Sequence, residues 1–563
     1  MADAKAKAVL QRRDALAEEH RLWVPHWQEL SDYIQPRKSN IAFQRSPAAQ
    51  QTDLMFDSTA PHALDLLGAS MQSALTSDAF KWFGYRVRGV ELPRDHELTK
   101  LLAECDRDSA DAIAQSNASS EMHETYLDLP CFGIAALMIE EQPAALNRPG
   151  GALRLTSVRP GEYIIDEDAD GLVDTVYRDF KLSARAAYGR YGDKLGKNVL
   201  AALQTNPSQK FEFVHALYPR EDAGFGKFRL PAPKKPIGSL TIGVADQNTV
   251  RESGYDEMPM MVPRWTKSSG ETYGRGPGTT MLPHIKTLNK AVELKLKMWA
   301  KKVDPPVMVR DEGVLGTVQL WNGGITYVRD VESIKLLDLG GDIQGADLEE
   351  DKLREEIRRG FFSDQLQLQE GPQMTAYETQ VRYELMQRVL GPTMGRVKVE
   401  LLDPMLARVF WVRLRSSARN SAYRQVEQWC RTNGVPLDIE YEGPLTKAQR
   451  LQDSISMQRF WQIVLPITQS QPDVLDVVDM DKVVRIHAAS VGIPPEVLRS
   501  AESVEAIREA RRTAQEQQAQ QEQLATSAKA GGDVAPLITA LAQQGQGSGV
   551  IPPGTGTPAL TSG

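Results

Sequence analysis

Residues 281–302 read MLPHIKTLNKAVELKLKMWAKK and predict a helix with two different faces. Apolar side chains recur at spacings of three and four, which places them on one side of a helix. They are Leu282, Ile285, Leu288, Val292, Leu296 and Trp299. The opposite side carries Lys286, Lys290, Lys297 and Lys301. The helix is expected to end at Asp304-Pro305-Pro306, because proline cannot continue a helix.

The chain that follows predicts a second helix, separated from the first by strands. Residues 304–345 combine glycines with short apolar runs, which indicates β structure. Residues 347–362 read DLEEDKLREEIRRGFF and predict a charged helix. A polar, glutamine-rich loop is expected at 363–374. The order is therefore helix, β segment, helix and polar loop.

A long helix is predicted after this loop, from Thr375 to about residue 415. Thr375 and Glu378 have the spacing of a capping box, in which each side chain bonds to the backbone of the other residue. Pro392 and Pro404 interrupt the stretch and are expected to kink it. Two more helices are expected, at roughly 446–464 and 481–491.

The N-terminal half predicts helices first and strands later. Helices are expected up to residue 90, with Pro36 ending the first of them and Asp57 and Ser58 capping the next. A buried strand is expected at 131–140, a hairpin around the acidic turn 166–171, and a β-rich section at 211–265. The fold class is therefore α+β and mainly helical.

Size and composition indicate a soluble protein with several subdomains. The chain has 563 residues, of which 41% are hydrophobic and 25% charged. Its net charge of −8 argues against tight DNA binding by the whole subunit. The three cysteines are far apart and predict neither a disulfide framework nor a zinc site. No signal peptide or membrane span is expected.

Motifs for chemistry give no candidate catalytic, metal-binding or cofactor-binding residue. Asp166, Asp168, Asp170 and Gly171 imitate the start of a calcium loop, but Tyr177 occupies the position where a bidentate Glu is needed. The glycine-rich stretch 274–280 lacks the lysine of a nucleotide-binding loop, and a hinge or tight connection into the helix is expected instead. The lysine face of 281–302 fits either contact with DNA phosphates or a solvated face.

Several short patterns, in this order along the chain, resemble the head-to-tail connector (portal) family of T7-like podovirus bacteriophages. They are Trp27-x-Glu29-Leu30-x-x-Tyr33-Ile34-x-Pro36, Asp57-Ser58-Thr59-Ala60 leading to Trp82-Phe83, Tyr273-Gly274-Arg275-Gly276-Pro277, Met374-Thr375-Ala376-x-Glu378, Leu390-Gly391-Pro392 and Gly492-Ile493-Pro494-Pro495. Each pattern alone is weak, but their order and spacing together are specific. The resemblance covers about residues 20 to 515.

The resemblance implies a portal fold and a division of the chain. The parts it implies are a wing at 1–280, a stem helix at 281–303, a β-containing clip at 304–345, a second stem helix at 346–362, a tunnel loop at 363–374, a kinked long helix with wing or crown at 375–465, a helical crown at 466–530 and a disordered tail at 531–563. Candidate tunnel-loop residues are Gln365, Gln367, Gln369, Glu370 and Gln373. The lysine face would line the DNA channel or meet neighbouring subunits, and the sequence leaves this open.

The resemblance also implies function and partners. Subunits, commonly twelve, would form a ring at one capsid vertex, through which double-stranded DNA is packaged and ejected without sequence-specific contacts. Expected partners are the terminase motor, capsid and scaffold proteins, and tail or adaptor proteins, with assembly in the host cytoplasm and no membrane. No enzymatic activity and no cofactor are expected. A scaffold or adaptor without a channel, or a phage DNA-processing enzyme, are the alternatives.

Overall fold

The structure is a computed structural model of the chain. It describes residues 3–38, 40–42, 52–77, 81–87, 96–142, 152–220, 234–303, 307–309, 334–336, 343–366, 391, 393–417, 421–441, 459–460, 462, 464, 466, 479–491, 497–499 and 501–530. The chain separates into two compact units, 1–91 with 97–475 and 92–96 with 476–563, and each unit is described by itself. The described elements are helices with antiparallel sheets, which confirms the α+β, mainly helical class.

A five-stranded antiparallel sheet forms the base of the first unit. Its order is β4 (Tyr163–Glu167), β5 (Val173–Ser183), β6 (Lys210–Pro219), β7 (Ile237–Gly243) and β8 (Asn248–Tyr255). β4 and β5 pair around the acidic turn, with Ile165 opposite Val176. The predicted hairpin and the β-rich section are both confirmed.

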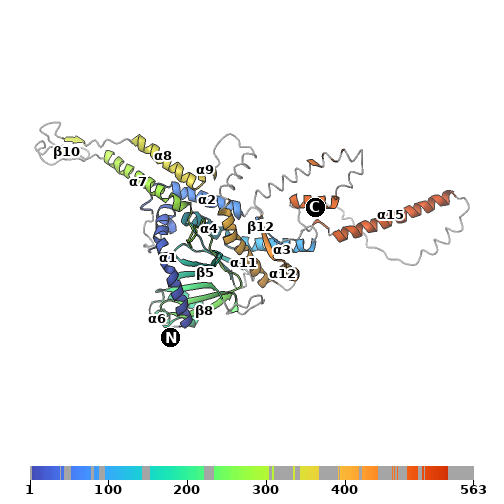
Figure 1. Ribbon diagram of the computed structural model, residues 1–563, viewed down its shortest axis with the longest axis horizontal. Helices are drawn as coiled ribbons and strands as arrows, with labels where there is room; N and C mark the ends of the chain where they lie inside the picture. The colour runs from blue at the N-terminus through green and yellow to red at the C-terminus, as the bar shows by residue number, and fades with distance from the viewer. Residues whose placement is uncertain are drawn as a thin grey trace, which may run out of the picture. The chain divides into compact units, whose positions relative to one another are not determined.

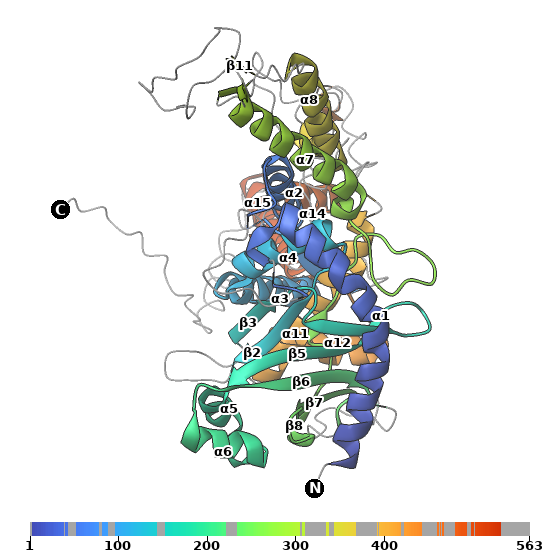
Figure 2. The same cartoon turned by 90° about the vertical axis from the view of Figure 1, so that its left-hand side faces the viewer.

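Helices cover both faces of this sheet because the strands alternate apolar side chains between the two. The long helix α1 (Ala4–Ile34) lies along one face, where Leu10 packs near Val214 and Ile242. Figure 2 shows α1 running along the sheet, with α5 (Ala184–Tyr191) and α6 (Lys197–Thr205) at the opposite side. There, Val199 packs in a cluster with Phe213. α1 ends at Ile34, and a single residue separates it from the short helix η1 (Pro36–Lys38). This confirms the prediction that Pro36 ends the first helix.

The prediction of a strand at 131–140 is wrong at its start. Residues 131 and 132 are the end of α4 (Ala118–Phe132), which closes on Gly133 in the left-handed conformation. The strand β2 begins at Leu137 and runs to Gln142, between β3 (Ala152–Ser157) and β9 (Met260–Met261). The helix end and the first three residues of the strand, 137–139, are buried. The apolar run therefore crosses an element boundary that hydrophobic periodicity cannot locate.

Three further helices and a small sheet belong to the described part of the first unit. They are α2 (Thr59–Leu75), α3 (His96–Ala114), α12 (Ala422–Asn433) and the two-stranded sheet of β1 (Phe83–Val87) with β12 (Leu437–Tyr441). The prediction of helices up to residue 90 is wrong at its end, because residues 83–87 pair as a strand. Asp57 accepts a hydrogen bond from the Thr59 backbone N–H at 2.8 Å, which confirms it as a cap of α2. Ser58 occupies the N-cap position but its side chain makes no capping bond, so that part of the prediction is wrong. A short 3-10 helix, η2 (Gly192–Lys194), links α5 to α6.

Helices α7 (Pro277–Val303) and α8 (Ile343–Gly360) lie side by side and form a hairpin that extends from the body (Figure 1). They are the two predicted helices, each starting about four residues earlier than expected. Beyond them, β10 (Val307–Val309) and β11 (Ile334–Leu336) pair antiparallel, and 310–333 lie outside the described residues. The first four residues of the predicted polar loop form a helical turn, α9 (Ser363–Leu366), so the loop prediction is wrong for them, and 367–374 lie outside the described residues.

The described part of the predicted long helix contains a π-helical turn. This turn, η5 (Lys398–Leu402), leads directly into α11 (Asp403–Ser416), with Pro404 in the first turn of α11. The expected irregularity at Pro404 is therefore a change of helix type. The capping box at 375–378 and Pro392 lie outside the described residues, as does most of 446–464, of which 459, 460, 462 and 464 are helical.

The second unit is helical in its described residues. α14 (Met480–Val491) confirms the helix predicted at 481–491, and α15 (Ala501–Ala530) follows it. Arg508 of α15 binds both carboxylate oxygens of Asp481 at 2.6 and 2.7 Å. The tail 531–563 lies outside the described residues.

Candidate functional site: the α7–α8 hairpin and its root

The glycine-rich stretch before α7 is a packing junction. Gly274, Gly276 and Gly278 face the last turn of α4, residues 130–133. A Cβ atom on any of the three would lie between 2.3 and 2.5 Å from a backbone carbonyl oxygen of that turn. Only glycine allows backbones to approach this closely. The tight connection into the helix that the sequence predicted is confirmed.

The root of the hairpin is fixed to the start of α2 by buried polar contacts. The Asn289 side-chain oxygen accepts the backbone N–H groups of Phe56 and Asp57 at 2.7 and 3.0 Å. Arg354 of α8 donates to the Asp57 carboxylate at 2.9 Å. Burial raises the pKa of Asp57, but the hydrogen bonds from Thr59 and Arg354 outweigh it and hold the pKa below its usual value. Both helices of the hairpin are thus attached at one point of the body.

The predicted lysine face exists, but most of its charge is paired within the chain. The four lysines all lie on α7: Lys286, Lys290, Lys297 and Lys301. Lys286 contacts Glu29 of α1 at 3.1 Å. Lys290 and Lys297 flank Glu293 at 2.9 and 2.5 Å, and their hydrogen bonds, with Lys297 the stronger influence, lower the pKa of that carboxyl. Lys301 is exposed in the last turn. The face is exposed, with a reduced excess of positive charge.

A fifth lysine, Lys295, joins the two helices of the hairpin. Its ammonium contacts Asp347 at 2.8 Å and Glu350, which is buried. Both contacts raise the pKa of Lys295, with Asp347 first. Sequence reasoning missed this residue because it lies off the predicted basic face. The acidic stretch at 347–351 was the available signal.

The apolar face of α7 changes from buried to exposed along its length. Leu282, Ile285 and Leu288 near the root are buried. Further along the same stripe, Leu296 is 48% exposed, Trp299 52% and Val303 86%. The distal half of the hairpin therefore carries an apolar stripe that the described part of this chain does not cover.

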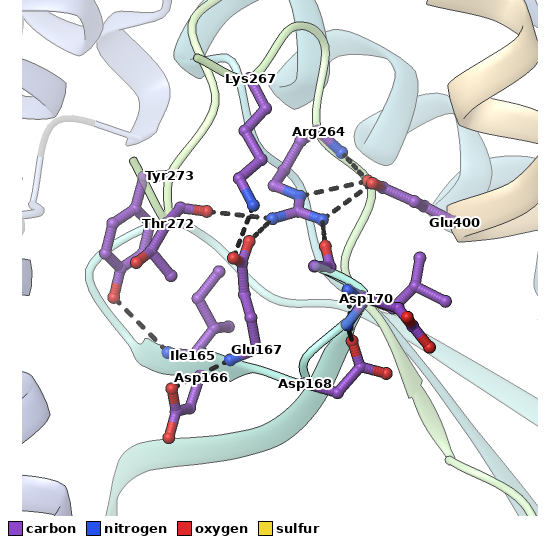
Figure 3. A network of polar contacts seen from close by, with 12 residues as sticks. Ile165, Asp166, Glu167, Asp168, Asp170, Arg264, Lys267, Thr272, Tyr273 and Glu400 are labelled. Atoms are coloured by element: carbon purple, nitrogen blue, oxygen red, sulfur yellow. Dashed lines mark hydrogen bonds and ion pairs between the residues drawn. The ribbon is translucent and has the colours of Figure 1, made fainter. Parts of the chain in front are cut away.

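A buried polar network lies just before α7, centred on Arg264 (Figure 3). Its guanidinium binds Glu400 of η5 through Nε at 3.3 Å and Nη2 at 2.8 Å. It also donates to Glu167 and to the carbonyl oxygens of Thr272 and Gly171. Burial lowers the pKa of Arg264, but its carboxylate partners outweigh this and raise it. The network connects β4, the segment leading to α7, and the π-helical turn.

The acidic turn 166–171 is stabilised by its own backbone. Asp168 accepts the N–H groups of Asp170 and Leu172 at 2.9 and 2.8 Å, which is the role of a turn-capping carboxylate. Within the described residues, no group of three or more His, Cys, Asp and Glu side chains is placed to hold a metal ion. No described helix is long and apolar enough to cross a bilayer.

An aromatic cluster joins α1 to the segment before α7. Trp27 is buried and stacks on Trp23, with their ring centroids 6.1 Å apart, and it meets Tyr273 edge-on at 5.2 Å. His20 packs against the same rings, and burial lowers its pKa to about 4. Tyr273 is part of the Tyr273–Pro277 pattern quoted above, so this pattern serves packing.

The candidate tunnel-loop residues fall largely outside the description. Gln365 lies in the helical turn α9. Gln367, Gln369, Glu370 and Gln373 lie outside the described residues. The described structure therefore includes the hairpin and its root, whereas the tunnel loop stays a prediction.

Comparison with known proteins defines the class to which this hairpin and body belong. Residues 6–498 match the family described as "Bacteriophage head to tail connecting protein". The match spans most of the chain, so the chain belongs to this family, as its short patterns predicted.

Two phage proteins are similar to the chain over nearly their whole length. One, described as "Probable portal protein" of Bordetella phage BPP-1, is 29% identical over 532 residues, 92% of each chain. The other, described as "Portal protein" of Salmonella phage epsilon15, is 25% identical and covers 91% of this chain and 92% of the relative. A solved structure titled "Neck of native GTA particle computed with C12 symmetry" covers 71% of this chain and 85% of its own, at 10% identity. Its TM-score of 0.30 is too low to support an assignment.

Proposed function

We propose that this chain, a phage portal subunit, closes with further copies into a ring through which double-stranded DNA enters and leaves the head. The α7–α8 hairpin would be the stem, and β10 with β11 would belong to the clip. The ring would belong to the virion at one vertex, with twelve copies as the expected number. Chemistry would be left to a separate packaging motor, and the chain itself would be structural.

The observation that carries this proposal is the apolar stripe of α7. Near the root it is covered by the chain's own core, and further out it emerges on Leu296, Trp299 and Val303. Half-exposed large apolar side chains in a continuous stripe favour a second protein surface. In a ring, one patch must meet a different patch on the next copy. We therefore assign the distal stripe to the contact between neighbouring stems.

Charge distribution supports the same contact for the lysine face. On α7, Lys290 and Lys297 are 62% and 64% exposed. On α8, Glu349 and Asp351 are 71% and 72% exposed, and they pair with Lys352 and Arg354 of the same helix. The basic side of one stem would thus meet the acidic side of the next. Because three of the four predicted lysines already have carboxylate partners, few positive charges remain to grip DNA phosphates. A weakly attractive lining suits DNA that has to slide.

The partners of such a ring would be the packaging motor, the capsid and scaffold proteins, and the tail or adaptor proteins. The candidate tunnel loop is retained as a proposal. Deleting residues 365–372 should leave rings intact and impair DNA packaging or retention in particles. Rings that fail to form after this deletion would contradict the placement of the loop.

Negative-stain imaging of the purified chain tests the proposal. We expect annular particles with a central hole, and no ATP hydrolysis or metal-dependent DNA cleavage by the same material. Solid or chain-like assemblies would indicate an adaptor without a channel. Nucleotide or DNA turnover would indicate an enzyme. Either of these outcomes would contradict the portal assignment.

A further inference from the structure

The guanidinium of Arg264 uses all of its hydrogen-bonding capacity inside the protein. Its side chain is 0% exposed, and its five N–H groups meet Glu400 twice and Glu167, Thr272 and Gly171 once each. The backbone N–H of Arg264 adds a third bond to Glu400, at 2.8 Å. The paired contacts of the planar Arg264 guanidinium with the Glu400 carboxylate are called the fork below. Such paired contacts fix the position of a carboxylate more strictly than a single contact would. Glu400 is therefore held firmly in place.

Glu400 belongs to a backbone element that has an alternative form. In η5, the Asp403 N–H bonds to the Lys398 carbonyl five residues earlier, which is the π-helical pattern. A π-helical turn contains one more residue than an α-helical turn, and such turns often occur at functional sites. Conversion to the α form would shift the register by one residue. The segment before η5 would then turn by about 100° and move by about 1.5 Å along the helix axis.

Pro404 brings the two forms closer in energy. In a regular α-helix, the nitrogen of residue 404 would face the carbonyl of Glu400, four residues earlier. Proline has no N–H to give this carbonyl, and its ring crowds it. The α form is thus penalised at this turn of the helix. A side-chain contact at Glu400 then adds to the balance between the two forms.

The core around η5 is packed for the π form. Val397 before the turn and Leu401 and Leu402 within it are buried. A shift of one residue would rotate Val397 relative to these two side chains and to Met405, which is also buried. The form of η5 therefore sets which side of the preceding helical segment faces the core.

We propose that Arg264 is a latch that holds η5 in its π form and so sets the rotational register of residues 393–397 against α11. Arg264 lies in the segment that leads into α7. A movement at the root of the hairpin would therefore reach η5 through this fork, and loss of the fork would allow η5 to become α-helical. The latch depends on contacts within one chain and does not require the ring.

Hydrogen exchange of the purified full chain, followed by mass spectrometry, tests the latch. Glu400→Gln removes the charge of the fork and keeps a similar shape. We expect exchange at residues 398–403 to accelerate about tenfold or more, because a buried guanidinium loses one of its two carboxylate partners. Arg264→Lys should have the same effect, since an ammonium cannot form the fork.

A matched control is a second buried-arginine contact to the helix that follows η5. Glu257 forms ion pairs with Arg408 at 3.1 Å and with Arg415 at 2.7 Å. Both arginines lie in α11, where the helix is regular. Glu257→Gln should lower the unfolding midpoint without accelerating exchange at 398–403. If Glu400→Gln leaves exchange there unchanged, or raises it only as much as Glu257→Gln does, the ion pair has an ordinary structural role and the latch is refuted.

A deletion tests the bistable turn without touching the fork. Val399 lies in η5 and is 52% exposed. Removing it should leave an α-helical turn with both flanks in their native register. The chain should therefore fold, with its unfolding midpoint lowered only by the cost that Pro404 adds to that turn, and exchange at 398–403 should not accelerate. Removing Ala407 from α11 should be far more damaging, because every later residue would rotate out of register. Equal damage from the two deletions would overturn the proposal.

Discussion

The two halves of α7 differ in what covers them. The half near the root has its apolar residues buried, and Asn289 bonds to the backbone before α2. The half beyond Val292 carries the same stripe, but Trp299 is half-exposed. Since the sequence pattern is continuous across both halves, the difference comes from the fold. The chain completes the first half itself and leaves the second half for another copy.

The largest expected effect on subunit stability lies in the first half. Ile285 is 1% exposed, so Ile285→Ala removes buried methyl groups and leaves a cavity. We expect the free energy of unfolding to fall by about 2–4 kcal/mol. A urea titration followed by tryptophan fluorescence measures this. Leu296→Ala, on the same stripe in the second half, serves as the control and should cost well under half as much.

The polar anchor at the root should come next. Asn289→Ala leaves the buried N–H groups of Phe56 and Asp57 without their acceptor. We expect a loss of about 2 kcal/mol, since unsatisfied buried donors carry their full desolvation cost. The same titration applies. A loss as small as that of an exposed substitution would mean that the root is not anchored through this residue.

Acid should weaken the cluster that joins α1 to the root. The pKa of His20 is lowered to about 4, so folding favours its neutral form. Its stabilising contribution is fully present above pH 6.5 and is lost as the pH falls towards 4. In thermal melts between pH 7 and 4, His20→Gln should lose stability less steeply than the native chain. Parallel pH profiles for the two proteins would contradict this role.

The smallest effect is expected from the lysine face. Lys290 and Lys297 are 62% and 64% exposed and share Glu293. Replacing either by alanine should change subunit stability by less than about 0.5 kcal/mol, because water screens exposed pairs. The same variants should weaken ring formation at low salt if this face meets the acidic side of a neighbour. Equal ring yields at low and high salt would argue for a merely solvated face.

Much of this architecture could be predicted from sequence, and the exceptions have physical reasons. The α7 stripe, the acidic hairpin turn and the stop at Pro36 depend on local periodicity and backbone chemistry, and all three were predicted correctly. The strand predicted from residue 131 starts only at Leu137, because the last turn of α4 and the first residues of β2 are all buried and hydrophobicity does not mark the boundary. The Arg264 network was missed because Glu167, Arg264 and Glu400 are distant in sequence and only the fold brings them together.

The most direct test of the account is to place a charge in the exposed part of the stripe and measure assembly. Trp299→Glu should give subunits with a native unfolding midpoint that no longer close into rings, as seen by mass photometry beside the native chain. Rings at the native yield would contradict the assignment of the distal stripe to a neighbouring copy. A midpoint as low as that of Ile285→Ala would show instead that Trp299 belongs to the subunit's own core.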